Sequence, residues 1–302
     1  MDEVIRLAGG AGEPALLLRR QKREGAPVLY VHGATFPSAL SAAYRFEGRS
    51  WLDDLSAAGF DAWAFDFAGF GGSERYAEMA LGQEGRPLGR AEQAVAQLAR
   101  AVERVAEASG RRVALVAHSW GSIPAGLYAS RRPERVERLC LFGPIARRDG
   151  HRRDGPGARW RLITVAEQLA RFVEDVPRGH PPVLIEPTLE SWGPAYLASD
   201  PDARSRTPAA VKIPAGPVAD VAAAWAGYLS WRPEDVVAPT LVVRGEWDSV
   251  TNDDDARWIL SRISHPLRRD VKVPKGTHLM HLELSREGLF EATRTFLKEP
   301  SA

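Results

Sequence analysis

The sequence predicts a doubly wound α/β protein, with a mostly parallel sheet, helices on both faces and an inserted, mainly helical cap. Three observations predict this class. Short apolar runs alternate with long helical patterns. The apolar runs are nearly continuous, as in parallel strands that are buried on both faces. The alternation stops over one long segment, residues 144–230.

Six core strands are expected, each a short run rich in β-branched and aromatic residues. The clearest helix, 91–108, lies between the second and third strands and carries Val95, Leu98, Val102 and Val105 on one stripe. Gly110 is placed to end it. In such sheets a ligand site lies beyond the carboxyl ends of the strands. The six expected strands are 27–31, 61–65, 113–117, 138–142, 240–244 and 270–273.

The chain is expected to divide into a core domain, 1–143 and 231–302, and a cap, 144–230. The cap segment is rich in proline and holds two helical stretches, near 162–174 and 218–229, but no convincing strand. A connection of this length in a compact domain is usually a functional insertion. Within it, the Arg-, Gly- and Asp-rich stretch 147–157 is expected to be a mobile loop.

Composition excludes several classes of protein. The 302 residues are 44% hydrophobic and 26% charged, which excludes a disordered or disulfide-stapled chain. With 40 basic and 39 acidic residues, the net charge of +1 favours neither nucleic acid nor an anionic membrane as partner. The single cysteine, Cys140, excludes an internal disulfide. No signal peptide or membrane span is visible, so a soluble, cytoplasmic protein is expected.

The strongest motif follows the third strand, where a serine lies between a strand and a helix. The run from Ala117 to Gly121 reads A-H-S-W-G and matches the nucleophile elbow G-x-S-x-G, with alanine at the first glycine position. Small residues are needed on both sides of Ser119 because the strained turn presses against neighbouring backbone. The turn also directs the N–H of Trp120 toward a developing oxyanion.

An acid and a histidine follow the fifth and sixth strands. Asp248 lies in the loop after 240–244, and His278 lies in the loop after 270–273. The order Ser, Asp, His places all three residues at the same edge of the sheet. A serine hydroxyl needs a base to take its proton, and that base needs a carboxylate to orient it. The three positions meet this requirement.

These features resemble the α/β-hydrolase family over essentially the whole chain. The resemblance rests on the elbow and the two loops just described, on the pair His32-Gly33, and on the glycine-rich run that starts at Asp66. It implies that Ser119 is the nucleophile, Asp248 the orienting acid and His278 the general base. It also implies an oxyanion hole built from the backbone N–H groups of Ala34 and Trp120. Two positions depart from the family pattern, Ala117 in place of glycine and Ala68 in place of arginine or proline.

Other residues compete for these roles. His281 is a rival base, although the family pattern H-x-x-H-L-E places the catalytic histidine first, and Glu246 is a weaker rival acid. The acidic run 253–255 is interpreted as the start of a helix, where carboxylates stabilise the helix dipole. No metal-ligand spacing is present, so neither a metal nor a cofactor is expected.

The sequence predicts a serine hydrolase that cleaves an ester or lactone of a small, largely apolar substrate. A serine at the elbow argues against the relatives that use aspartate there. Three alternatives stay open: a proline iminopeptidase, with Glu186 or Glu190 binding the substrate amine, a carbon–carbon bond hydrolase, and a ligand-binding or biosynthetic member without turnover. The residues expected to line the substrate pocket are His32, His118, Trp192, Tyr196 and Trp225.

Overall fold

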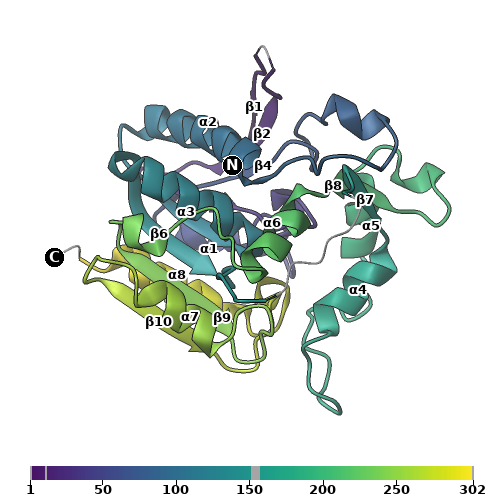
Figure 1. The fold of residues 1–302 in the computed structure, drawn as a ribbon. Helices are drawn as coiled ribbons and strands as arrows, with labels where there is room; N and C mark the ends of the chain where they lie inside the picture. The colour runs from purple at the N-terminus through teal and green to yellow at the C-terminus, as the bar shows by residue number, and fades with distance from the viewer. Residues whose placement is uncertain (1, 11, 151–156, 301–302) are drawn as a thin grey trace.

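The computed structural model describes residues 2–10, 12–150 and 157–300 (Figure 1). Within these ranges, eight strands form one sheet in the order β1-β2-β4-β3-β5-β6-β9-β10. All neighbours from β4 to β10 run parallel, and only the pairs β1/β2 and β2/β4 are antiparallel. The strands are β1 (Asp2–Leu7), β2 (Leu16–Gln21), β3 (Pro27–Val31), β4 (Asp61–Asp66), β5 (Val113–His118), β6 (Val136–Phe142), β9 (Thr240–Gly245) and β10 (Arg268–Val273).

The doubly wound, mostly parallel sheet predicted from the sequence is confirmed. The six expected strands are present, with ends that differ from prediction by no more than two residues. The N-terminal hairpin of β1 and β2 was not predicted. β1 lies at the edge of the sheet and alternates between half-buried Ile5 and exposed Arg6. β2 starts with three buried leucines but continues with Arg19 and Arg20, so neither strand has the continuous apolar run of a strand buried on both faces.

Helices cover both faces of the sheet. Neighbouring positions on β5 show why its sequence is apolar throughout, because Leu115 faces one hydrophobic cluster and Val116 faces the other. The first cluster includes residues of α2 (Ala91–Ser109), α3 (Ser122–Arg131) and α7 (Asp253–Leu260). The second includes residues of α1 (Trp51–Ala57) and α8 (Arg286–Lys298). The predicted end of α2 is also found, since Gly110 adopts a left-handed conformation there.

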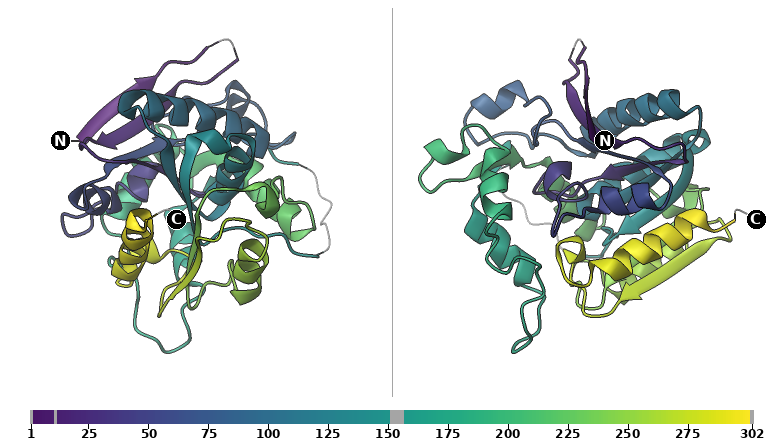
Figure 2. Two further views of the ribbon diagram at one scale, coloured as in Figure 1. Left: turned by 90° about the vertical axis from the view of Figure 1, so that its left-hand side faces the viewer. Right: turned by 180° about the vertical axis from the view of Figure 1, so that it is seen from behind.

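The segment between β6 and β9 is mainly helical, as predicted, but it also contains a small antiparallel sheet of β7 (Trp160–Ile163) and β8 (Val211–Pro214). Its helices are α4 (Val165–Val173), α5 (Trp192–Ala198) and α6 (Gly216–Trp225). The first predicted helix therefore begins later than expected, because Thr164 forms a capping box with Glu167 and residues 160–163 pair as a strand. Figure 2 shows β7, β8, α4 and α5 together at one side of the core.

Two predictions about this segment lie beyond what the structure tests. The domain boundaries at 144 and 230 stay a prediction, although "cap segment" is used below for residues 144–230. The predicted mobile stretch 147–157 falls largely on residues 151–156, which lie outside the described residues.

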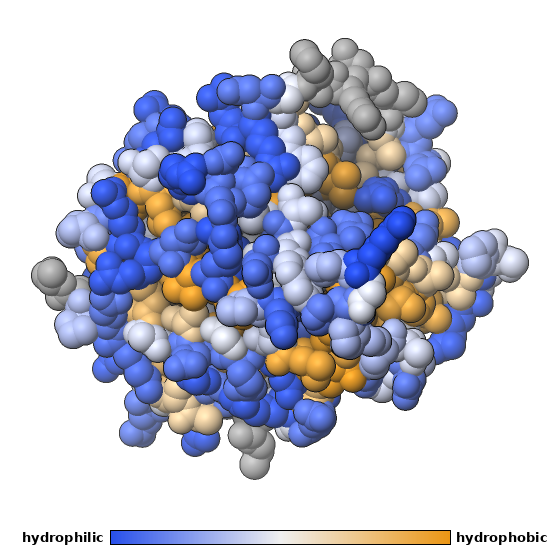
Figure 3. All heavy atoms as spheres, turned by 90° about the horizontal axis from the view of Figure 1, so that it is seen from below, coloured by the Kyte–Doolittle hydropathy of each residue, from blue (hydrophilic) through white to orange (hydrophobic). Residues whose placement is uncertain are grey.

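The face drawn in Figure 3 is mainly hydrophilic, with small hydrophobic patches between the polar side chains. Among the helices that the structure describes, none is long and apolar enough to span a bilayer.

Candidate active site

The turn after β5 places Ser119 at the carboxyl edge of the sheet. Ser119 has a φ of +54°, in the left-handed region that side chains other than glycine rarely adopt. Ser119, Trp120 and Gly121 form one short turn of 3₁₀ helix, and α3 begins at the next residue. A Cβ atom at position 121 would lie 2.5 Å from the carbonyl oxygen of His32, so only glycine fits there. The local backbone is thus the strained elbow that the sequence predicted.

The structure brings Ser119, His278 and Asp248 into one hydrogen-bonded row. His278 Nε2 lies 2.7 Å from Ser119 Oγ, and His278 Nδ1 lies 3.0 Å from Asp248 Oδ2. The histidine and the aspartate are buried, and the three residues come from loops that follow β5, β9 and β10. Such a row allows His278 to accept the serine proton while the carboxylate holds the ring in one tautomer.

Backbone groups hold the carboxylate of Asp248 in place. Its Oδ1 atom accepts hydrogen bonds from the N–H groups of Val250 and Thr251, both at 2.9 Å. Gly143, directly after β6, lies close behind the histidine. A Cβ atom there would be 2.9 Å from His278 Nδ1 and 3.1 Å from Asp248 Oδ2. Sequence reasoning missed Gly143, because its closeness to His278 arises only when β6 lies beside β9.

His281, the rival base, does not reach the serine. It is buried against Phe36, Phe142 and His118, and neither of its ring nitrogens has a hydrogen-bond partner among the described residues. Burial, aided by the nearby His278, lowers its pKa from 6.5 to about 3, so the ring is neutral at physiological pH. Its position is that of a core residue.

His118 and His32 are buried imidazoles on either side of the elbow. His118 Nε2 donates to the carbonyl oxygen of His278 at 3.0 Å, and His32 Nδ1 donates to that of Gly33 at 2.7 Å. The other nitrogen of His32 accepts a hydrogen bond from the N–H of Phe67, which fixes this tautomer. Burial lowers the pKa of both rings. His32 thereby holds the loop that carries Ala34, whose N–H has no partner in the described chain.

A cavity of about 740 Å³ opens above Ser119 and His278. Of the five residues expected to line it, His118 and Trp225 do so. His32 is instead buried and does not line the cavity, and Trp192 and Tyr196 stack on each other, with ring centroids 5.0 Å apart. Trp192 is packed against the core, where its indole contacts Phe36 and donates a hydrogen bond to the carbonyl oxygen of Leu40. Its apolar lining comes from both core and cap segment: Ala34, Phe36, Ile145, Ile163, Ala170, Phe172, Val218, Val221, Trp225, Val250 and Leu279.

No group of three or more His, Cys, Asp or Glu side chains in the described ranges is placed to hold a metal ion. Cys140 is fully buried in β6, and burial raises the pKa of its thiol.

The sequence model of the family described as serine aminopeptidase, S33, matches residues 28–285. The chain belongs to the S33 family. It is an enzyme of the α/β-hydrolase superfamily, as the resemblance found in the sequence predicted. A comparison with curated proteins returned no match.

Solved structures share the α/β-hydrolase fold over the whole chain. A thioesterase domain from the curacin biosynthetic pathway has 16% sequence identity and a TM-score of 0.66, over 99% of this chain and 100% of that one. A serine hydrolase involved in carbazole degradation has 18% identity and a TM-score of 0.64, over 98% and 99%. The 2-hydroxy-6-oxo-6-phenylhexa-2,4-dienoate hydrolase from Rhodococcus sp. strain RHA1 has 19% identity and a TM-score of 0.63, over 99% and 100%. At these identities the likeness establishes the fold alone.

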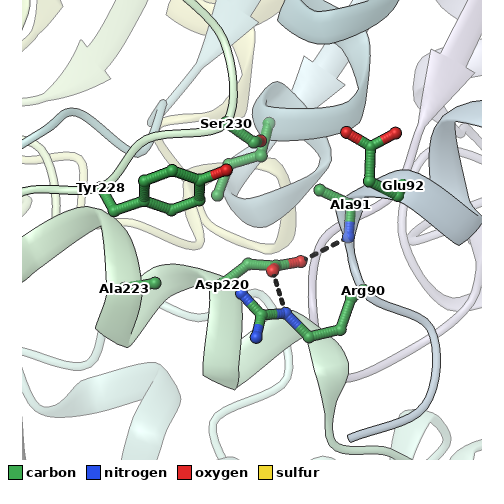
Figure 4. Close-up of a pocket in the computed structure, with 8 residues that line it drawn as sticks. Arg90, Ala91, Glu92, Asp220, Ala223, Tyr228 and Ser230 are labelled. Carbon is green, nitrogen blue, oxygen red and sulfur yellow. Dashed lines mark hydrogen bonds and ion pairs between the residues drawn. The ribbon is translucent and has the colours of Figure 1, made fainter.

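In this S33-family hydrolase, the cap segment is tied to the elbow through Asp220 of α6. The Asp220 carboxylate accepts hydrogen bonds from Arg90 Nε at 2.6 Å, from the N–H of Ala91 at 2.7 Å and from the Trp120 indole at 3.1 Å. Figure 4 shows the contacts with Arg90 and Ala91 in a small pocket at the start of α2. Burial raises the pKa of Asp220, while these donors act in the opposite direction. Sequence reasoning missed Asp220 because no local pattern marks it.

Proposed function

We propose that this protein is a serine hydrolase that cleaves carboxylic esters or lactones through an acyl-enzyme. One observation carries the proposal: the unbroken row from Ser119 Oγ through His278 to Asp248, at the floor of a largely apolar cavity. A serine paired with a buried, oriented imidazole is the arrangement that acyl transfer needs.

In the proposed reaction His278 takes the proton of Ser119 as its oxygen attacks the substrate carbonyl. The backbone N–H groups of Ala34 and Trp120 stabilise the oxyanion, and each such donor typically contributes about 2.7–4 kcal/mol. His278 then donates the proton to the leaving alcohol. Water, activated by the same imidazole, releases the acid and restores Ser119.

The proline iminopeptidase alternative gains no support from the residues considered for it. The Glu186 carboxylate accepts hydrogen bonds from the backbone N–H groups of Ser191 and Trp192 at the start of α5, and Glu190 accepts one from Thr188. Neither glutamate lines the cavity around Ser119. They are therefore occupied in local structure.

The test is labelling with a fluorophosphonate, read by intact mass, on the wild type and on Ser119→Ala. We expect one adduct per wild-type chain and none on the variant. Esters, lactones, a proline anilide and a vinylogous diketone are then assayed side by side. An unlabelled but folded wild type, with no turnover of any of these, would refute the proposal in favour of a ligand-binding role.

A further inference from the structure

The cavity above Ser119 contains two arginines that differ in their contacts. Arg171 on α4 forms an ion pair with Glu174, with 2.5 Å between Nη1 and Oε1. Arg161 on β7 also lines the cavity and is half-buried. No carboxylate of the described residues lies within 4.0 Å of its guanidinium, which donates no hydrogen bond to them. Among the residues that the structure describes, Arg161 is thus a cation in the cavity without a contacting partner.

The carboxylate that acts on Arg161 electrostatically, Glu167, is engaged elsewhere. Its Oε2 atom accepts hydrogen bonds from the N–H of Thr164 at 2.7 Å and from Thr164 Oγ1 at 2.8 Å. These bonds, with a smaller contribution from Arg161, keep the pKa of Glu167 below its usual value. The capping box therefore holds Glu167 at the start of α4, out of contact with the guanidinium.

A guanidinium has five N–H donors in a planar fork that matches a carboxylate. A charged group that is partly removed from water without partners is unfavourable, so an incoming anion gains those unused donors. Most of the remaining lining is apolar, with Ile163 two residues along β7 from Arg161, and Val218 and Trp225 on α6. The two carboxylates of the lining are already engaged, Glu167 by Thr164 and Glu174 by Arg171. The cavity therefore fits a ligand with an apolar body and one anionic end.

We propose that Arg161 binds a carboxylate of the substrate, so that the enzyme prefers esters whose acyl part carries a second, free carboxylate. This inference rests on the proposed esterase function. It names the substrate class for that site: half-esters of dicarboxylic acids, with the ester carbonyl at Ser119 and the free carboxylate at Arg161.

The kinetic test compares mono-(4-nitrophenyl) esters of succinic, glutaric, adipic and suberic acids with neutral 4-nitrophenyl esters of equal chain length. The wild type is expected to prefer at least one half-ester over its neutral counterpart in kcat/KM. In Arg161→Gln that preference should fall about 10- to 100-fold, because a charge-assisted hydrogen-bonded pair is lost. Arg161→Lys should recover part of it.

The matched control is Arg178→Gln. Arg178 is an exposed arginine of the same cap segment that does not line the cavity. This variant makes the same change in net charge and should keep the wild-type preference within about twofold. An equal fall in both variants would mean a long-range charge effect and would overturn the assignment to Arg161. A wild type that turns over neutral esters and shows no preference for any half-ester would overturn it as well.

A binding measurement separates this inference from the proposed function. In Ser119→Ala, calorimetry should show hexanoate binding at least tenfold more tightly than hexanamide, and Ser119→Ala with Arg161→Gln should lose the difference. This comparison needs no turnover, so it can succeed even if the ester assays and fluorophosphonate labelling fail. Equal affinity for hexanoate and hexanamide, or no binding of hexanoate, would refute carboxylate binding. Tighter binding of hexyl phosphate than of hexanoate would overturn the choice of carboxylate in favour of phosphate.

Discussion

At the residue scale, the elbow depends on two neighbours with opposite requirements. Ser119 carries a side chain in a left-handed conformation that costs of order 1 kcal/mol or more. Gly121 carries none, because the backbone of His32 occupies the space where a Cβ atom would lie. The close packing of Gly121 against the backbone of His32 therefore holds Ser119 in its strained conformation.

Gly121→Ala should therefore lower the free energy of unfolding by about 2–3 kcal/mol, since the new methyl group meets backbone that cannot move aside. Urea denaturation measures the change. Gly82→Ala is the control, because a Cβ atom at Gly82 meets nothing within 4 Å. Equal stability of the two variants would contradict the close approach at the elbow.

The two histidines of the loop after β10 should respond differently to substitution. His278→Ala should reduce kcat/KM for an ester by several orders of magnitude, because the members of such a row act as a unit. His281→Leu should keep activity within about tenfold, since no hydrogen bond from His281 to another described residue is lost. Steady-state kinetics on one ester tests both, and a larger loss in His281→Leu would reverse the assignment of the base.

The buried rings also make stability depend on pH. The pKa of His281 is about 3 in the folded protein and 6.5 for a histidine in water, so between these pH values the unfolded chain binds a proton that the folded protein does not. Above pH 6.5 the ring is neutral in both states, and the contribution of His281 to the free energy of unfolding is complete. As the pH falls from 6.5 toward 3, this contribution decreases by about 1.4 kcal/mol per pH unit.

His281→Leu should lack this pH dependence. Its free energy of unfolding should therefore rise by about 2 kcal/mol relative to that of the wild type when the pH is lowered from 7 to 5. Urea unfolding at several pH values measures it. If the free energies of unfolding of wild type and His281→Leu changed equally with pH, His281 would not contribute to the pH dependence.

At the scale of elements, α6 both lines the cavity and is fastened to the core. Val218, Val221 and Trp225 face the cavity, while Asp220 on the same helix binds the start of α2 and the indole of Trp120. A shift of this helix would move the cavity wall and release the neighbour of Ser119. The position of α6 is thus connected with the shape of the site.

Asp220→Asn should weaken this attachment and lower the free energy of unfolding by about 1–3 kcal/mol, because a buried charge-assisted pair is lost. We expect KM for an ester to rise more than kcat falls. Asp202→Asn is the control, at an aspartate of the cap segment whose side chain is 77% exposed. If Asp220→Asn matched this control in both stability and KM, the attachment would have no energetic role.

Local patterns predicted the core elements well, because buried parallel strands have continuous apolar runs and Gly110 marks a helix end. They missed β7, because Leu162 and Ile163 fit the start of the helix expected near 162–174. For the site, Ser119, Asp248 and His278 could be selected because each follows a strand. Trp192 is buried against Phe36 and Leu40 of the core and Arg161 faces the cavity, and no sequence pattern distinguishes these environments.

At the scale of the whole molecule, the cavity is enclosed jointly by core and cap segment, so its size limits the substrate. Its volume of about 740 Å³ lies within the range of small-molecule sites. The catalytic candidates lie on core loops, and much of the apolar wall belongs to the cap segment. Under the proposed function, reactivity and substrate size would therefore be determined by different parts of the chain.

A series of neutral 4-nitrophenyl esters should show this limit. Each added methylene should raise kcat/KM up to about fourfold, from about 0.8 kcal/mol of burial, until the cavity is full. Trp225→Ala should move the plateau to longer acyl chains, because it removes a wall of the cavity. Trp247→Ala is the control, because Trp247 does not line the cavity, and it should leave the plateau at the same chain length. A plateau that does not move in Trp225→Ala would contradict the inference that the cavity wall limits the acyl chain.

The cap segment leaves the sheet after β6 and the chain re-enters it at β9, and these two strands are direct neighbours, with Leu139 opposite Thr240. Because β6 and β9 run parallel, the chain leaves the sheet at its carboxyl edge and re-enters it at its amino edge, so the cap segment is part of the crossover between two neighbouring strands. An insertion of another length or shape can be exchanged at the carboxyl edge without altering the register of any strand pair. Recombination at this single junction could give a descendant a new substrate range in one event, with its reactive groups inherited intact.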